Sequence, residues 1–288
     1  MTSSNHLLSG KICMVTGSNT GIGKATAMGL ARMNAAVVMV CRDRRKGEAA
    51  RDEIRAKTGN PCVDLMIADL SSQQAIRQLA EDFKSRHDRL HVLVNNAGII
   101  RNDRALSVDG IEMTLAVNHL AYFLLTNLLL DVLKQSAPAR VINVASKLHS
   151  DTLNFNNLQG EQTYSAVDAY ARSKLCNILF TYELARRLEG TGVTANCLHP
   201  GVIRTNLIGG FFAGAMKPLY FMSAPFFASP EKGARTSIYL ASSPAVAGVT
   251  GKYFIDSKGA CSSAGSYDLM LAARLWQKSA ELTSLESV

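Results

Sequence analysis

The hydrophobic pattern of the chain consists of short apolar runs separated by longer stretches with helical periodicity. Each run is rich in β-branched or other apolar residues and stops at a glycine, a proline or a polar cluster. Such runs are typical of strands buried on both faces of a parallel sheet. They predict strands at residues 12–16, 37–41, 62–68, 92–94, 140–144, 194–198 and 253–255.

Helical patterns lie between most of these runs. Ser72 is placed to cap one of them, and the five predicted helices cover residues 24–33, 46–57, 73–86, 111–135 and 164–188. Regular alternation of strand and helix favours a parallel sheet that is wound right-handed with helices on both faces. We therefore predict a single α/β domain over residues 1–288, a doubly wound Rossmann-type sheet.

Composition narrows the class of protein. The chain has 288 residues and a formal charge of +8, but its tightest basic cluster is only Arg42, Arg44, Arg45 and Lys46. Without a dense basic arm, we expect no nucleic-acid partner. The six cysteines are scattered, with no Cys-x-x-Cys pair, which favours reduced thiols and neither a disulfide framework nor a metal site.

Targeting signals also bear on location. The first residues lack the basic start and apolar core of a signal peptide, and no apolar run approaches the roughly 20 residues of a spanning helix. We expect a soluble cytoplasmic protein without a transmembrane segment.

The first predicted loop carries a nucleotide-binding signal. After the strand at 12–16 the chain reads Gly17-Ser18-Asn19-Thr20-Gly21-Ile22-Gly23 and then becomes helical. Glycines let the backbone approach a pyrophosphate closely, and the helix N-terminus presents unpaired amides and a positive dipole end. The alternative is a tight turn between strand and helix with no ligand, because the spacing differs from Gly-x-Gly-x-x-Gly.

Arg42 indicates which nucleotide the loop would bind. It follows the second predicted strand, where an acidic residue would accept hydrogen bonds from a ribose 2′-hydroxyl. An arginine suits a 2′-phosphate instead. Arg44, Arg45 and Lys46 are mostly solvated charges at a helix start. The sequence therefore predicts NADP(H) in preference to NAD(H).

Tyr170 and Lys174 form a candidate acid/base pair. A spacing of four places both side chains on one face of a helix, one turn apart. An ammonium beside a phenol favours the phenolate and lowers the phenol pKa from its usual value of about 10. A chance pair on a surface helix is the alternative.

Together these motifs resemble the short-chain dehydrogenases/reductases. The resemblance runs from about residue 10 to 256 and rests on Thr16-Gly17-x-x-x-Gly21-Ile22-Gly23, Asn95-Asn96-Ala97-Gly98, Asn118, Ser146, Tyr170-x-x-x-Lys174 and Pro200-Gly201. Longer stretches such as Asn157-Leu158-Gln159-Gly160-Glu161 are similar to the NADP-dependent retinol dehydrogenase group. That group reduces retinal or oxidises retinol, and often accepts other lipid aldehydes.

The resemblance implies roles for four catalytic residues. Tyr170 would exchange a proton with the substrate oxygen, and Lys174 would lower the pKa of that tyrosine and bind the nicotinamide ribose. Ser146 would hold the substrate oxygen, and Asn118 would keep a water that links Lys174 to solvent.

The resemblance also implies the cofactor contacts. Asp69 and Leu70 would flank the adenine, and Arg42 would take the 2′-phosphate. The loop of Asn96, Ala97 and Gly98 would line the adenine-ribose side. Residues 200–205 would close over the nicotinamide through Pro200, Gly201, Val202 and Thr205.

Three functions stay open at this stage. The first is an NADP-dependent oxidoreductase acting on retinal, retinol or a related apolar aldehyde. The second is a carbonyl reductase for steroid, lipid or xenobiotic carbonyls, and the third is a nucleotide-binding regulator that has lost catalysis. The intact set of four catalytic residues argues against the third.

Several further features yield expectations. The apolar segment at about 203–230 would act as a substrate-side lid, with a peripheral membrane contact through 209–228. By resemblance, the two long helices would form a homodimer interface. His119, His149 and His199 have no metal-ligand spacing and are interpreted as packing or loop histidines, with His149 at the edge of the substrate pocket.

Overall fold

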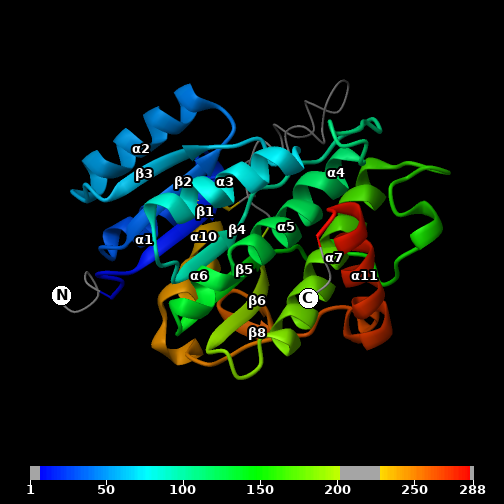
Figure 1. Cartoon of the computed structure of the whole chain (residues 1–288). Helices are drawn as coiled ribbons and strands as arrows, with labels where there is room; N and C mark the ends of the chain where they lie inside the picture. Colours follow the sequence, from blue (N-terminus) through cyan, green and yellow to red (C-terminus); the bar gives the residue numbers. More distant parts are fainter. Residues whose placement is uncertain (1–6, 202–227, 286–288) are drawn as a thin grey trace.

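The computed structural model describes residues 7–201 and 228–285. Its strands form one eight-stranded sheet in the order β3-β2-β1-β4-β5-β6-β7-β8, with helices on both sides (Figure 1). All neighbouring pairs are parallel except β7 and β8. The predicted single-domain, doubly wound α/β fold is confirmed.

The strands coincide with the apolar runs. Their bounds are β1 Ile12–Thr16, β2 Ala36–Cys41, β3 Val63–Ile67, β4 Val92–Asn95, β5 Ala139–Val144, β6 Val193–His199, β7 Tyr253–Ile255 and β8 Lys258–Ala260. Alternation along β1 sends Met14 into one apolar cluster and Cys13 and Val15 into the other. Because both faces are covered, most positions of these central strands carry apolar side chains, and the buried polar ones, such as Thr16, Asn95 and Asn143, lie at or near the carboxyl ends.

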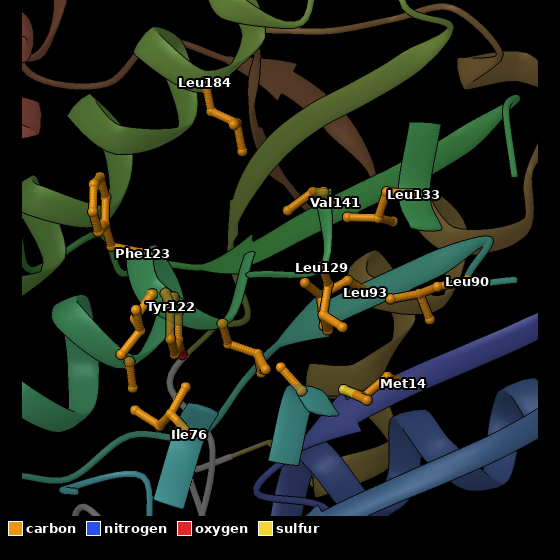
Figure 2. Close-up of a cluster of buried hydrophobic side chains, with 14 of the residues drawn as sticks. Met14, Ile76, Leu90, Leu93, Tyr122, Phe123, Leu129, Leu133, Val141 and Leu184 are labelled. Atoms are coloured by element: carbon orange, nitrogen blue, oxygen red, sulfur yellow. The ribbon is translucent and has the colours of Figure 1, made fainter. Parts of the chain in front are cut away.

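Each face of the sheet has its own layer of helices. Helices α1 (Gly21–Arg32), α2 (Arg44–Thr58) and α10 (Pro230–Ser242) contribute to the cluster around Val15. Helices α3 (Gln73–Arg86), α5 (Ala121–Leu128), α6 (Leu130–Gln135) and α7 (Ala166–Arg187) cover the other face. Figure 2 shows side chains of this second cluster, among them Met14, Leu93 and Val141 from adjacent strands.

The helix predicted at 111–135 is not one regular helix. It consists of α4 (Met113–Leu115), a π-helical turn η1 (Ala116–Leu120), α5 and α6, with a change of backbone direction at Leu129. The buried Glu112 carboxylate accepts the amides of Thr114 and Leu115 and so sets the start at Met113. A π turn inserts one extra residue into the helix, a feature that often occurs at functional sites. Here it contains Asn118.

Helix α11 (Leu269–Leu282) was not predicted, and it covers the face formed by α5 and α7. Its Trp276 ring lies 5.0 Å from that of Phe123 on α5 and 5.8 Å from that of Phe180 on α7. Figure 1 shows α11 alongside α7. Helix α11 thus covers part of α7, and the expected homodimer through the two long helices stays a prediction.

Two further expectations concern the membrane and the lid. Within residues 7–201 and 228–285, no helix is both long and apolar enough to cross a bilayer. The predicted lid at 203–230 and the membrane contact at 209–228 lie almost entirely outside the described residues, as do Val202 and Thr205.

Candidate active site

The candidate active site is a cleft of about 1130 Å³ at the carboxyl ends of the strands. Ligands of open α/β sheets bind at this edge, where the strand order reverses, here between β1 and β4. The loops after β1 to β6 all contribute to its lining. A second hollow of about 900 Å³ lies elsewhere and is lined by none of the described site residues.

One wall of the cleft is the N-terminus of α1. Thr20 at its N-cap makes no side-chain cap bond, and no acidic residue lies in the first turn. By contrast, Asp43, Ser72 and Ser165 cap α2, α3 and α7 through their side chains. The amides of the first turn of α1 thus lack a side-chain acceptor and border the cleft, which suits a phosphate.

Glycines make this turn sterically feasible. Gly17 and Gly21 have φ values of +65° and +57°, in the left-handed region. A Cβ at Gly23 would lie 2.3 Å from the Gly17 carbonyl oxygen. The Asn96 side chain braces the loop by donating to the Thr16 carbonyl at 2.8 Å. These residues fit the pyrophosphate of a dinucleotide, and each of them except Thr16 lines the cleft.

Ser18 differs from the other residues of the predicted loop, all of which line the cleft. Its side chain is fully buried, its hydroxyl donates to the Val40 carbonyl at 3.3 Å, and it does not line the cleft. We interpret Ser18 as a tie between the loop and β2. Its backbone amide also bonds to Val40.

Arg42 lies at the rim of the cleft, at the end of β2. Its side chain is 78% exposed and its guanidinium is 3.7 Å from the Asp69 carboxylate. Asp69 and Leu70 follow β3 and line the same part of the cleft. Lys46 on α2 lines it too, whereas Arg44 and Arg45 do not, which agrees with the expectation that at least two of these three are solvated helix-start charges.

The loop after β4 separates the rim from the inner part of the cleft. The Thr16 hydroxyl accepts the amides of Asn96 and Ala97 at 2.9 and 3.1 Å. A Cβ at Gly98 would lie 3.5 Å from Asn118 Oδ1 and 3.7 Å from Lys174 Nζ. This loop therefore lies directly against the lysine ammonium.

Lys174 is buried beneath this loop. It is 3% exposed, and its ammonium donates to the Val144 carbonyl at 2.9 Å. It also lies 5.5 Å from the centroid of the Tyr170 ring. Burial disfavours the charged form and lowers the pKa of Lys174 to about 7.

Tyr170 and Ser146 meet in the cleft. Burial raises the pKa of Tyr170 above 10, and a hydrogen bond with Ser146 offsets part of the rise. This direction is opposite to the expected lowering by Lys174. The physical reason is that desolvation of the phenol is the largest contribution, and the nearby lysine is itself desolvated and prone to lose its charge.

Asn118 lies behind the cleft on the π turn η1. Its Oδ1 accepts the Ile99 amide at 2.8 Å, and its Nδ2 donates to the Ile99 carbonyl at 2.9 Å and to Ser173 Oγ at 3.0 Å. The fully buried amide thus ties the loop after β4 to the helix that carries Tyr170 and Lys174. The predicted water contact of Asn118 stays a prediction.

The three histidines have separate environments. His149 donates from Nδ1 to the Ser146 carbonyl at 2.7 Å and accepts the Ser263 amide at 3.0 Å, and it does not line the cleft. His199 does line it, next to Pro200 and Gly201, and accepts the Lys147 amide at 3.0 Å. His119 is fully buried, 2.8 Å from Ser279 of α11.

Sequence reasoning missed most of the apolar lining of the inner cleft. These residues are Ile99, Ile100, Met113, Val117, Val144 and Leu148. Two of them follow Asn96-Ala97-Gly98 directly, and Met113 and Val117 are one helical turn apart. The adjacency to this motif and the spacing of Met113 and Val117 are the sequence features that could have identified these lining residues.

The comparisons with known proteins agree with this geometry. Residues 11–214 match the family model for short chain dehydrogenases. Retinol dehydrogenase 11 of Mus musculus is 44% identical over 98% of this chain and 89% of its own length. Retinol dehydrogenase 14 of Homo sapiens is 46% identical over 97% of this chain and 88% of its own length.

Two solved structures share the fold. A crystal structure of a protein from Mycobacterium paratuberculosis has a TM-score of 0.77 and 33% identity, covering 96% of this chain and 94% of that one. Pseudomonas aeruginosa RhlG in an active-site complex with NADP has a TM-score of 0.70 and 29% identity, covering 87% and 96%. By its matched residues, its fold and its cleft, the chain belongs to the short-chain dehydrogenase/reductase family, the oxidoreductases that act on CH–OH and C=O groups.

Proposed function

We propose that the protein is an NADP(H)-dependent oxidoreductase that interconverts retinal and retinol, or a related apolar aldehyde and its alcohol. The observation that carries the proposal is one cleft with a basic rim and an apolar inner wall. Arg42 and Lys46 belong to the rim, and Ile99, Met113 and Val117 belong to the wall. The site residues lie between these two parts.

The proposed chemistry adds a hydride to the carbonyl carbon and a proton to its oxygen, or removes both. Bound NADPH would supply the hydride. Tyr170 would donate the proton, since its raised pKa keeps the hydroxyl neutral at ordinary pH and the half-buried side chain lines the cleft. Ser146 bonds to Tyr170 and would hold the substrate oxygen beside the phenol.

The Lys174 charge would offset the negative charge that develops on Tyr170 as its proton leaves. Its ammonium lies close to the Tyr170 ring and in a desolvated setting, where electrostatic interactions are strong. Ile99, held by Asn118, and Gly98 border this group. The buried hydrogen bonds would keep the reacting groups in place without reorganisation.

Two observations support NADP(H) over NAD(H). Arg42 and Lys46 both border the part of the cleft beside Asp69. Arginine binds phosphate through several parallel hydrogen bonds, which neither a carboxylate nor a short polar residue provides. The related RhlG forms a complex with NADP.

The apolar wall and the relatives' names support an apolar substrate. A pocket of this composition binds long hydrocarbon chains through burial of apolar area, which contributes about 25 cal/mol per Å². The relatives are named retinol dehydrogenases.

The test is a panel of carbonyls with both cofactors. Purified protein is assayed with all-trans-retinal, hexanal, a small aromatic aldehyde and a steroid ketone, each with NADPH and with NADH. We expect kcat/KM to be at least about 10-fold higher for retinal than for hexanal, because a missing apolar contact costs that much. A steroid ketone preferred over retinal would indicate a carbonyl reductase. NADPH binding without turnover of any carbonyl would overturn the proposal in favour of a regulator.

A further inference from the structure

Tyr122 is a fully buried tyrosine next to the site that the reaction scheme leaves unused. It follows Asn118 by one helical turn, on α5, and is 1% exposed. Its neighbour Phe123 is equally buried, and the two side chains point to different sides of α5 (Figure 2). Phe123 packs on Phe180 and Trp276, away from the cleft.

The ring of Tyr122 contacts the lysine charge. Lys174 Nζ lies 5.8 Å from its centroid and 5.5 Å from that of Tyr170. Within the described residues, Lys174 has no carboxylate partner, and its ammonium makes one hydrogen bond, to the Val144 carbonyl. Two aromatic faces therefore lie within cation–π distance of this buried cation.

The hydroxyl of Tyr122 acts on the loop after β4. It donates to the Ala97 carbonyl at 2.7 Å. The next residue, Gly98, lies against Lys174, and Ile99 is held by Asn118. Asn118 and Tyr122, one turn apart, thus fix the residues on either side of Gly98.

We propose that Tyr122 is a positioning residue of this enzyme, whose ring stabilises the charged form of Lys174 and whose hydroxyl fixes the Ala97–Gly98 backbone against the cofactor. The inference rests on the role proposed for Lys174. It assigns separate effects to the two parts of one side chain. Loss of the ring would change the Lys174 charge, and loss of the hydroxyl would change cofactor affinity.

The ring effect has a defined sign. Cation–π contacts favour the ammonium, so Tyr122→Leu lowers the pKa of Lys174, which is already about 7. The pH at which activity and NADPH affinity fall through loss of this charge moves down by about 0.5 to 1 unit. The other groups facing Lys174 are Tyr170 on α7, with Ser146 bonded to it, the Asn118 amide on η1 and the Val144 carbonyl on β5, and they are unchanged.

The experiment measures NADPH binding by fluorescence, and kcat and KM, from pH 5 to 10. Tyr122→Leu is compared with Tyr122→Phe, which keeps the ring. We expect Tyr122→Phe to keep the wild-type pH profile and to bind NADPH about 3- to 30-fold more weakly, as expected when a buried carbonyl loses its donor. Phe123→Leu is the matched control, because it removes a buried ring from the same helix on the side away from Lys174. Its pH profile should equal that of the wild type.

Three outcomes overturn the inference. The first is an unshifted pH profile in Tyr122→Leu, and the second is an equal shift in Phe123→Leu. The third is a shift in Tyr122→Phe equal to that in Tyr122→Leu, which would exclude the ring as the source because Tyr122→Phe keeps it. If Tyr122→Leu fails to fold, Tyr122→Met replaces it, and thermal unfolding checks both. If the wild type binds NADPH but reduces no carbonyl, the proposed function fails, while the pH dependence of NADPH binding still decides the role of Tyr122.

Discussion

The two ends of the cleft hold their positive charges in opposite ways. At the rim, Arg42 is 78% exposed and only loosely paired with Asp69. Inside, Lys174 is 3% exposed, bonded to a backbone carbonyl and in contact with two aromatic rings. The exposed Arg42 charge costs the folded state almost no free energy. The Lys174 charge is desolvated, and its pKa falls to about 7.

The difference matches the two roles proposed for these cations, cofactor affinity at the rim and catalysis at the inner end. An exposed charge is screened and adds little to stability, so we expect that Arg42 can be replaced without unfolding the protein, which makes its proposed role in cofactor preference testable. A buried charge is strongly coupled to its neighbours, and under the proposed mechanism it would contribute to the reaction at the expense of stability. Variants at the two ends should therefore separate activity, cofactor choice and stability.

The largest expected effect is at the inner end. Tyr170→Phe removes the proton donor, and positioned general acids contribute 10²- to 10⁴-fold. We expect kcat to fall by about that factor, with the NADPH dissociation constant within about 2-fold of wild type, since the hydroxyl acts on substrate. Steady-state kinetics and fluorescence titration measure the two quantities.

Tyr182→Phe is the matched control for this variant. Tyr182 lies on the same helix, its hydroxyl bonds to Ser262, and it does not line the cleft. Its kcat should stay near that of the wild type. If Tyr170→Phe kept most of its activity, the proposed role of Tyr170 would be wrong.

A smaller effect is expected at the rim. Arg42→Ala should weaken NADPH by about 10- to 100-fold, the contribution of a charge-assisted hydrogen bond, and leave NADH nearly unchanged. Arg44→Ala is the control, because Arg44 is similarly exposed, pairs with Glu48 at 3.6 Å and does not line the cleft. Equal losses for both cofactors in Arg42→Ala would show that this arginine does not bind the 2′-phosphate.

The smallest effect is a gain in stability. Below pH 7 Lys174 is charged in the folded and unfolded states, and the fold bears the full burial cost. Between about 7 and the unfolded value of about 10.4, only the unfolded state keeps the proton, so the cost decreases as pH rises. Lys174→Met should raise Tm by several degrees at pH 6 and by much less at pH 10. Calorimetry that found equal gains at both pH values would contradict this cause.

The sheet was predictable because its strands are buried on both faces. The runs around Met14, Val38 and Ile142 contain little except apolar residues, so periodicity alone located them. The β7–β8 hairpin was missed because its turn uses Asp256 and Ser257, both at positive φ, instead of the usual Asn-Gly. The π turn at Asn118 could not be predicted, because it does not change the pattern of hydrophobic and polar residues along the helix.

Two helices were missed although their starts can be read from the sequence. Ser229 precedes Pro230 and Glu231, and Asp268 precedes Leu269, which are ordinary N-terminal signals for α10 and α11. The sequence motifs of the family identified the residues that lie around Lys174. They could not indicate Tyr122, because its contacts with Ala97 and Lys174 depend on how a helix packs against a loop.

Helix α11 follows the last strand of the sheet in the sequence, and this order has a consequence for synthesis. Phe123 and Phe180 pack against Trp276, which is translated well after both of them. Until that segment emerges, the nascent protein has a complete sheet but an uncovered apolar groove between α5 and α7, a surface that attracts chaperones and other unfinished chains. A premature stop between residues 260 and 269 would leave every site residue and every strand of the sheet translated and still yield a chain prone to aggregate.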